Sequence, residues 1–153
     1  MDALNIAKYF LYKANLEGDL ITNLKMQKLL YYAQAWYLVN FKNRVLFDDV
    51  IEAWDFGPVI PSVYHHFKEY RHTPIDYKSS PNSIFKKVQG EEKEYLDEFY
   101  DKFINFSAHD LVNMSHNEEP WEIAFKNSIK VIDIDNIRKY YSDLYKKRTK
   151  AKN

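Results

Sequence analysis

This sequence of 153 residues contains no cysteine and only three glycines. Without cysteine the chain has no disulfides, no thiolate metal ligands and no thiol nucleophile. Gly18, Gly57 and Gly90 lie far apart, which excludes the glycine-rich loops that bind the phosphates of nucleotides. The G-x-S-x-G motif of serine hydrolases is absent as well.

Long apolar segments and an excess of one charge are also missing. No window reaches the roughly 18 uncharged apolar residues of a membrane span, and the first residues, MDALNIAKYF, do not resemble a signal peptide. The 22 basic and 22 acidic residues cancel, whereas a dedicated nucleic-acid binder usually carries a basic excess. We therefore expect a cytoplasmic protein with no membrane segment and no nucleic-acid partner.

Aromatic residues are abundant. Thirteen Tyr, ten Phe and three Trp make up 17% of the chain, and hydrophobic residues make up 46%. A chain of this length buries roughly 70% of the surface that its unfolded form exposes, which is enough for one domain. We expect this domain to span residues 1–145 and the basic tail, residues 146–153, to fray.

The segment 21–38, ITNLKMQKLLYYAQAWYL, has the strongest helical pattern. Thr22 or Asn23 can cap it, and no Gly or Pro interrupts it. Its apolar residues recur at helical spacing and cover most of the circumference, namely Met26, Leu29, Leu30, Tyr31, Tyr32, Ala33, Trp36, Tyr37 and Leu38. Such a helix is normally enclosed, so we predict a central helix at about 23–39.

The rest of the chain predicts a mainly α fold, a compact bundle of six to seven helices. There is no alternation of strands and helices that would indicate a doubly wound sheet. Caps and apolar periodicity predict further helices that begin near Asp2, Pro61, Glu91, Ser107, Pro120 and either Asp133 or Asp135.

Two segments depart from the helical pattern. The β-prone pieces 45–47 and 50–54 predict a small irregular hairpin within residues 45–54, although the second piece is equally compatible with a helical turn. Gly57-Pro58 is interpreted as a chain break. The segment 71–90 contains Pro74, Pro81 and Gly90, and we expect a long connection there.

Histidines are the remaining candidates for chemistry. His65 and His66 would diverge by about 100° on a helix, so we interpret them as surface residues rather than metal ligands. His116, which precedes Asn-Glu-Glu at 117–119, could belong to an acid–base or metal site. We favour a structural interpretation, in which Asn117 or a glutamate caps the next helix and His116 bonds a neighbour, because no partner constellation accompanies it.

We accordingly predict a protein that is not an enzyme and has no catalytic residue, metal or cofactor. An uncharacterised enzyme that uses His116 and Glu119 is kept as an alternative. Lys25, Gln27 and Lys28 on the central helix leave two equal interpretations, a solvated edge or a strip that faces acidic groups of a partner.

Three segments taken together resemble the Panacea antitoxin domain, a SocA-like, phage-associated domain formerly of unknown function. They are ITNLKMQKLLYYAQAWYL (21–38), FDDVIEAWDFGPVIPSVYHHFK (47–68) and LVNMSHNEEPWEIA (111–124). The combination is specific, while any one segment alone would be weak. The matching positions expected to be structural are Gln27, Leu29, Leu30, Tyr32, Glu52, Gly57, His116, Glu119, Pro120 and Trp121.

The resemblance implies a mostly helical antitoxin that neutralises a neighbour-encoded protein toxin by direct contact. An alternative, also implied by the family, is an adaptor that delivers a bound partner to a Clp-type protease. From the residues themselves we expect the toxin to contact the exposed edge of the central helix and the loop around the Gly-Pro turn, because rings and lysines beside a rigid turn make a preformed patch. These positions are Lys25, Lys28, Tyr31, Trp54, Phe56, Pro58 and Val59.

Overall fold

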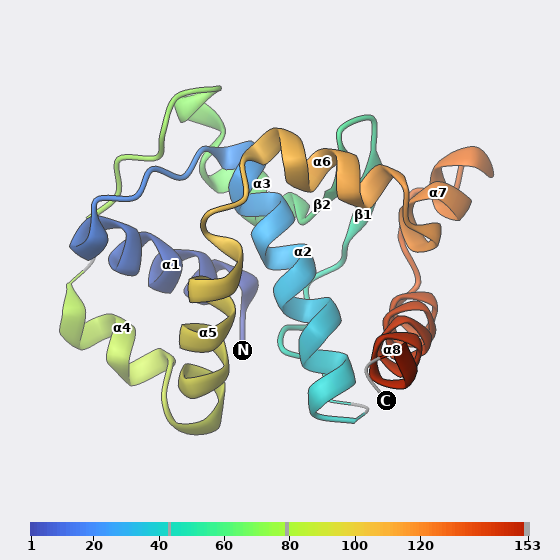
Figure 1. The fold of residues 1–153 in the computed structure, drawn as a ribbon. Helices are drawn as coiled ribbons and strands as arrows, with labels where there is room; N and C mark the ends of the chain where they lie inside the picture. The colour runs from blue at the N-terminus through green and yellow to red at the C-terminus, as the bar shows by residue number, and fades with distance from the viewer. Residues whose placement is uncertain (43, 79, 152–153) are drawn as a thin grey trace.

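The computed structural model describes residues 1–42, 44–78 and 80–151, so the last two residues of the predicted tail lie outside it. The mainly α fold is confirmed (Figure 1), with eight α-helices in the described ranges where six to seven were predicted. The elements are α1 (Ala3–Glu17), α2 (Asn23–Asn40), β1 (Glu52–Trp54), β2 (Gly57–Val59), α3 (Pro61–His66), the 3-10 helix η1 (Lys68–Tyr70), α4 (Pro81–Lys87), α5 (Gly90–Phe103), α6 (Ala108–His116), α7 (Glu119–Lys126) and α8 (Ile134–Ala151).

The predicted central helix is confirmed as α2. Its Thr22 cap accepts a hydrogen bond from the Lys25 N–H at 3.2 Å, and thirteen of its 18 residues are buried. In Figure 1 it runs through the middle of the molecule, and it packs against α1, α3, α5, α6, α8 and β2. Neighbours on all sides explain why its apolar residues cover most of its circumference.

Local signals at helix ends are mostly confirmed. Gly18 ends α1 in a left-handed conformation, with φ +75°, and Ser107 and Asp110 form a reciprocal capping box at the start of α6. Asp2 occupies the N-cap of α1, but its side chain makes no capping bond there. The Ala3 N–H is instead satisfied by Asp49 Oδ1 at 2.9 Å, a residue distant in sequence.

The predicted small hairpin exists, but its strands differ from the predicted pieces. β1 and β2 pair antiparallel, with Glu52 opposite Val59 and Trp54 opposite Gly57. The piece 45–47 is not a strand, and Gly57-Pro58, interpreted as a break, begins β2. Residues near 131 add to β1 from the other side, since the Ala53 N–H donates to the Lys130 carbonyl at 2.8 Å. Pro58 is tolerated because β2 is an edge strand.

The segment 71–90 is not a continuous connection, because it contains α4. Pro81 occupies the first turn of this helix, where a missing N–H costs nothing, and Ile84 is buried against the core. At the other end of the chain, α8 extends to Ala151, so residues 146–151, which we expected to fray, are helical. Among the described residues, no helix combines the length and apolarity needed to cross a membrane.

Candidate functional site

Two polar residues of α2 bind the side of the hairpin that faces this helix. The Lys28 Nζ donates to the Pro58 carbonyl at 2.7 Å, and the Gln27 Oε1 accepts from the Ile60 N–H at 2.9 Å. The Gln27 amide group is held in turn by Asn23 Oδ1 at 2.9 Å. Both side chains are 0% exposed. Buried backbone groups need partners, so this pair provides the strand with bonds that a two-stranded hairpin lacks.

Gly57 is required where α2, α6 and β2 meet. Its φ of +106° lies in the region that favours glycine, and an added Cβ would stand 2.8 Å from Ser115 Oγ and 3.0 Å from Lys28 Cε. The three segments that carried the family resemblance therefore converge at one point. We call this region, comprising Gln27, Lys28, Gly57, Pro58 and Ser115, the motif junction.

The electrostatics of the junction are dominated by Lys28. Burial lowers the pKa of its ammonium group from 10.5 to about 7, because the charged form loses its hydration. A neutral lysine amine can act as a base or nucleophile, but this one is enclosed and bonded to the Pro58 carbonyl. Its geometry suits a clamp between helix and hairpin.

Stacked rings connect the hairpin to α6 and α7. The Trp121 Nε1 donates to the Trp54 carbonyl at 2.8 Å, and the Trp54 Nε1 donates to Glu52 Oε1 at 2.9 Å. His116 stacks on Trp121 with 4.1 Å between ring centroids, and Phe125 also stacks on Trp121, at 4.7 Å. These contacts fix the outer side of the hairpin on a rigid aromatic support.

The structural interpretation of residues 116–119 needs correction in its details. His116 Nε2 is buried without a hydrogen-bond partner among the described residues, and the imidazole ring stacks on Trp121. Glu118 occupies the N-cap of α7 but makes no side-chain cap. Its carboxylate accepts a hydrogen bond from the Tyr32 hydroxyl instead.

Glu118 is thus the partly buried glutamate that contacts α2, while Glu119 is exposed. Burial raises the pKa of the Glu118 carboxyl, against the hydrogen bond from Tyr32. The Tyr141 hydroxyl donates to the Tyr31 hydroxyl at 3.3 Å in the same cluster. Within the described ranges, no three His, Asp or Glu side chains are arranged as metal ligands.

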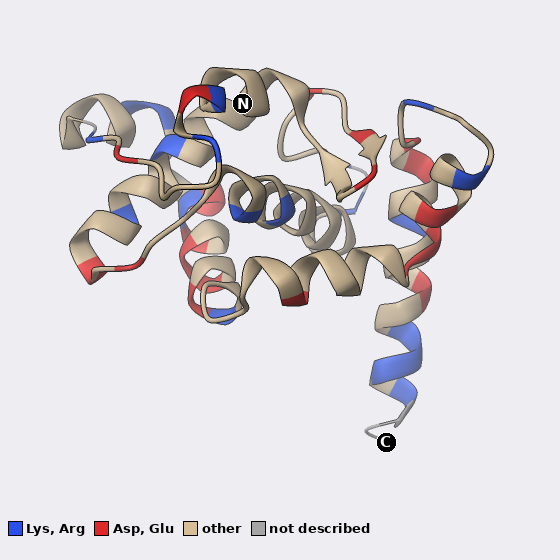
Figure 2. Ribbon diagram, turned by 90° about the horizontal axis from the view of Figure 1, so that it is seen from above, with Lys and Arg blue, Asp and Glu red and all other residues tan. Residues whose placement is uncertain are grey.

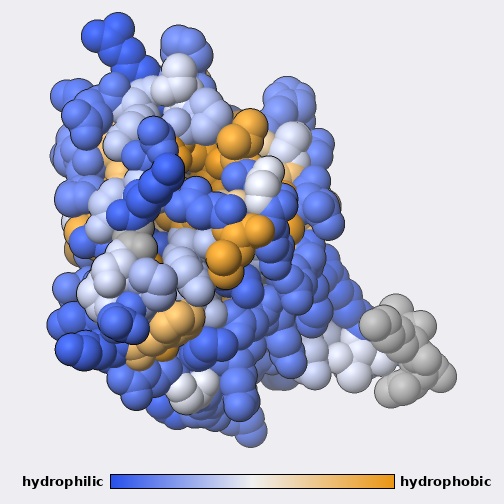
Figure 3. Space-filling model, turned by 90° about the vertical axis from the view of Figure 1, so that its left-hand side faces the viewer, coloured by the Kyte–Doolittle hydropathy of each residue, from blue (hydrophilic) through white to orange (hydrophobic). Residues whose placement is uncertain are grey.

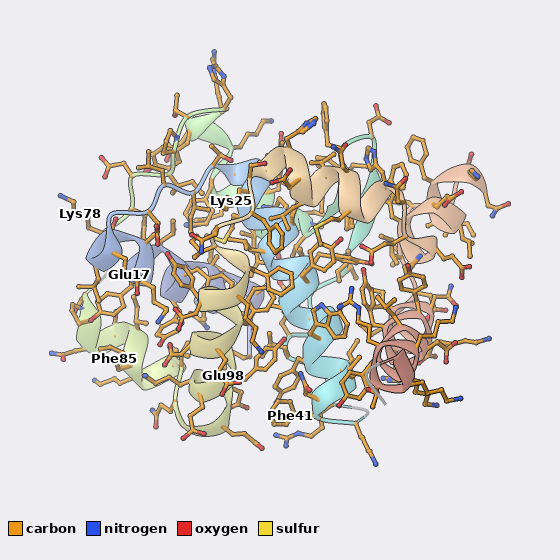
Figure 4. The ribbon with its side chains drawn as sticks, in the orientation of Figure 1. Glu17, Lys25, Phe41, Lys78, Phe85 and Glu98 are labelled. Atoms are coloured by element: carbon orange, nitrogen blue, oxygen red, sulfur yellow. The ribbon has the colours of Figure 1, made fainter. Side chains whose placement is uncertain are left out.

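Four of the seven predicted contact residues are buried, which corrects their expected exposure. Lys28 and Tyr31 are 0% exposed, so the expected exposed edge of α2 does not exist there, and Pro58 and Val59 are buried too. Lys25, labelled in Figure 4, is partly buried and donates to the Ile104 carbonyl. The expected exposed edge is absent because β2 and α8 cover it, with Lys28 bonded to the Pro58 carbonyl and Tyr31 to the Tyr141 hydroxyl.

The other family-motif positions are divided between the core and the junction's edge. Leu29, Leu30, Tyr32, Pro120 and Trp121 are buried. Trp54 and Glu52 are half-buried, and Phe56, in the turn of the hairpin, is 63% exposed. Phe56 is thus the most accessible of the predicted contact residues.

Sequence reasoning missed the apolar residues beside this turn. Phe125 stacks on Trp121, the Ile129 N–H bonds to the Ala124 carbonyl, and Val131 bridges to Glu52. All three are exposed, by 41%, 51% and 45%. Together with Phe56 they form what we call the hairpin surface. The only signal in the sequence was the alternation of Ile129 and Val131 with polar residues, which is typical of a strand.

A second region with exposed apolar residues lies elsewhere. Figure 3 shows the side of the molecule where α1 ends and the chain turns towards α2, with apolar side chains among polar ones. Leu16 and Leu20, at the end of α1 and in the loop after it, are 69% and 71% exposed. No motif residue of the junction belongs to this region, so it provides matched control positions.

Comparison with known proteins gives one family and one curated relative. The family model described as "Antitoxin SocA-like, Panacea domain" matches residues 26–122, which include the motif junction. The chain is 46% identical over 67 residues to "Antitoxin SocA" of Caulobacter vibrioides (strain NA1000 / CB15N). This alignment covers 44% of the chain and 35% of the relative, so only about a third of the relative's length is spanned. No solved structure matches.

Proposed function

Because this chain belongs to the family of SocA-like antitoxins with a Panacea domain, we propose that it neutralises a protein toxin by binding it directly. The observation that carries the proposal is the family match over residues 26–122, with all three motif segments meeting at one junction. The similarity to a relative named as an antitoxin supports the same role.

We propose that the hairpin surface is the site of toxin contact. Phe56, Phe125, Ile129 and Val131 are exposed apolar side chains on two supported segments. Lys28, Gln27 and Trp121 fix the hairpin that carries Phe56. Phe125 stacks on Trp121, and Val131 bridges to Glu52 of β1. Large side chains held on a rigid support lose little entropy on binding, and such residues contribute most of the free energy at protein interfaces.

Co-expression with the toxic product of a neighbouring reading frame tests the function. We expect the wild-type protein to restore growth and to copurify with the toxin in a fixed ratio. Failure of the protein to rescue any neighbouring toxin, together with an absence of copurification, would contradict the antitoxin role.

The contact site is tested separately with Phe56→Asp and the control Leu20→Asp, since both replace an exposed apolar residue by a charge. A charge at a central contact should weaken toxin binding about 30-fold or more, while the control should bind like the wild type. Binding is measured by calorimetry after circular dichroism has confirmed equal folding. Equal affinities for the two variants would place the contact elsewhere.

An adaptor that delivers its partner to a Clp-type protease differs from a neutraliser in one measurable respect. The half-life of the toxin in cells would shorten when this protein is present, and the shortening would depend on the protease. For direct neutralisation we expect rescue of growth with an unchanged toxin half-life.

A further inference from the structure

A groove separates α5 from α8 on the front of the molecule. Both helices pack against α2 (Figure 1), and the space of about 630 Å³ between them has Trp36 and Asn40 of α2 in its lining. One wall is α5, with Tyr95, Phe99 and Phe103, and the other is the C-terminal half of α8. The groove is therefore lined by rings and bounded by two helices, which suits the docking of a third helix.

The α8 wall extends beyond the body of the molecule as a basic arm, which we define as residues 144–150. Figure 2 shows this end of α8 projecting, with Lys and Arg coloured along it. The arm contains Lys146, Lys147, Arg148 and Lys150 and no acidic residue, a net charge of +4. Arg148 lies over the Trp36 ring at 5.6 Å, while the three lysines are exposed.

The α5 wall has the opposite charge. Its residues 90–103 include six acidic and two basic side chains, a net charge of −4. Asp97 forms ion pairs with Lys13 and Lys93, at 3.0 and 2.8 Å. Glu94, Glu98 and Asp101 are exposed and spaced by four and three residues, so they form one stripe on the helix. Glu98, labelled in Figure 4, lines the groove.

We propose that two copies of this chain form a two-fold symmetric dimer in which the basic arm of each copy lies in the groove of the other. Tyr145, 51% exposed, would then be covered by the rings of the groove, and the lysines of the arm would face the acidic stripe of the partner's α5. A two-fold interface uses the same surface on both copies, which this pairing satisfies because arm and groove are adjacent in each chain.

The charge pattern identifies the occupant as a second copy. α5, which forms one wall, carries a net charge of −4, although Lys102 lines the groove beside Glu98, and this charge is opposite to the +4 of the projecting arm of the same chain. No ion pair joins α5 to α8 within one copy among the described residues, so the two charged surfaces remain free for another molecule. Attraction between exposed charges is screened by salt, so the dimer should weaken as ionic strength rises.

Two charge-reversed proteins test the pairing. In the arm variant Lys146, Lys147 and Lys150 are replaced by Glu, and in the stripe variant Glu94, Glu98 and Asp101 are replaced by Lys. Light scattering coupled to gel filtration should give the wild type twice the 18.4 kDa mass of one chain at low ionic strength. The dissociation constant of each variant dimer alone should be about tenfold higher than that of the wild type, or more, because like charges then meet. Mixing the two variants should restore a dimer, since each arm again meets an oppositely charged stripe.

A matched control reverses three exposed lysines outside the groove, Lys68, Lys86 and Lys87, and should remain dimeric. Circular dichroism confirms that all variants fold. A monomeric wild type at low ionic strength would overturn the proposal, as would a dimer that persists in either variant. Folded variants that stay monomeric after mixing would also overturn it, because the charges would then not act between copies.

Discussion

At the residue scale, the most informative side chain is Lys28. An amphipathic helix normally exposes its lysines, yet this amine is enclosed with the Pro58 carbonyl as its hydrogen-bond acceptor. Because its pKa is lowered to about 7, the Lys28 amine is only partly protonated in the folded protein at neutral pH. Burying this charge costs free energy, and the burial occurs where α2 packs against the hairpin at Gly57.

This burial predicts a pH dependence of stability. Between about pH 7 and pH 10.5 the unfolded chain binds a proton at Lys28 that the folded chain does not. The free energy of unfolding should therefore rise with pH, by up to about 1.4 kcal/mol per unit, and be flat with respect to this group below pH 7. Urea unfolding gives the free energy of unfolding of the wild type and of Lys28→Met. The wild-type value minus the Lys28→Met value should increase as the pH rises from about 7 to 10.5.

The control for this prediction is Lys87→Met, at an exposed lysine of α4. Its difference from the wild type should stay constant over the same pH range. A constant difference for Lys28→Met as well would show that the Lys28 amine is not desolvated in the folded state.

At the scale of elements, helix boundaries follow from short-range chemistry. Ser107 at the start of α6 accepts from the Asp110 N–H at 3.0 Å, and the Ser107 N–H donates to Asp110 Oδ2 at 3.2 Å. Both partners lie within four residues, so this box could be predicted from the sequence. α6 in turn carries Ser115 into the motif junction and His116 onto Trp121, which links a local cap to the geometry of the site.

Removal of the cap has a predictable cost. Ser107→Ala should lower the free energy of unfolding by about 1 kcal/mol, because the Asp110 N–H at the start of α6 loses the hydroxyl oxygen that accepts its hydrogen bond. Ser107→Asp, which retains a side-chain acceptor, should stay close to the wild type. Urea unfolding distinguishes the two, and an equal loss for both variants would mean that the hydroxyl has a role other than capping.

At the scale of the whole molecule, a single helix organises the core. α2 contacts six other elements, and its aromatic residues interlock with those of α5 and α8, as in the stacking of Tyr32 on Phe103 and the edge contact of Trp36 with Tyr141. The N-terminal and C-terminal parts of the chain therefore share one core, and they should unfold together.

The central role of α2 predicts a large effect of a small cavity. Leu30→Ala, at a residue that is 0% exposed, should destabilise the protein by about 2–5 kcal/mol. Leu16→Ala, at a residue that is 69% exposed, should change stability by about 0.5 kcal/mol or less. Calorimetry measures both, and two separate transitions in either variant would argue against a single core.

Local chemistry explains what could be predicted from the sequence. The existence of α2 and the caps at Thr22 and Ser107 depend on residues within one or two turns of each other, so they could be predicted from the sequence. The short helix α4 was missed because its one deeply buried residue, Ile84, leaves almost no periodic pattern.

The candidate site, in contrast, was decided by tertiary contacts. Lys28 and Pro58 are separated by 30 residues, and Trp121 and Trp54 by 67, so no local pattern indicates that these groups meet. Apolar residues around most of its circumference indicated that α2 would be buried. Only packing decided that its lysine would be enclosed, that Phe56 would stay exposed, and that α5 and α8 would leave a groove, because burial depends on every neighbour that the folded chain brings together.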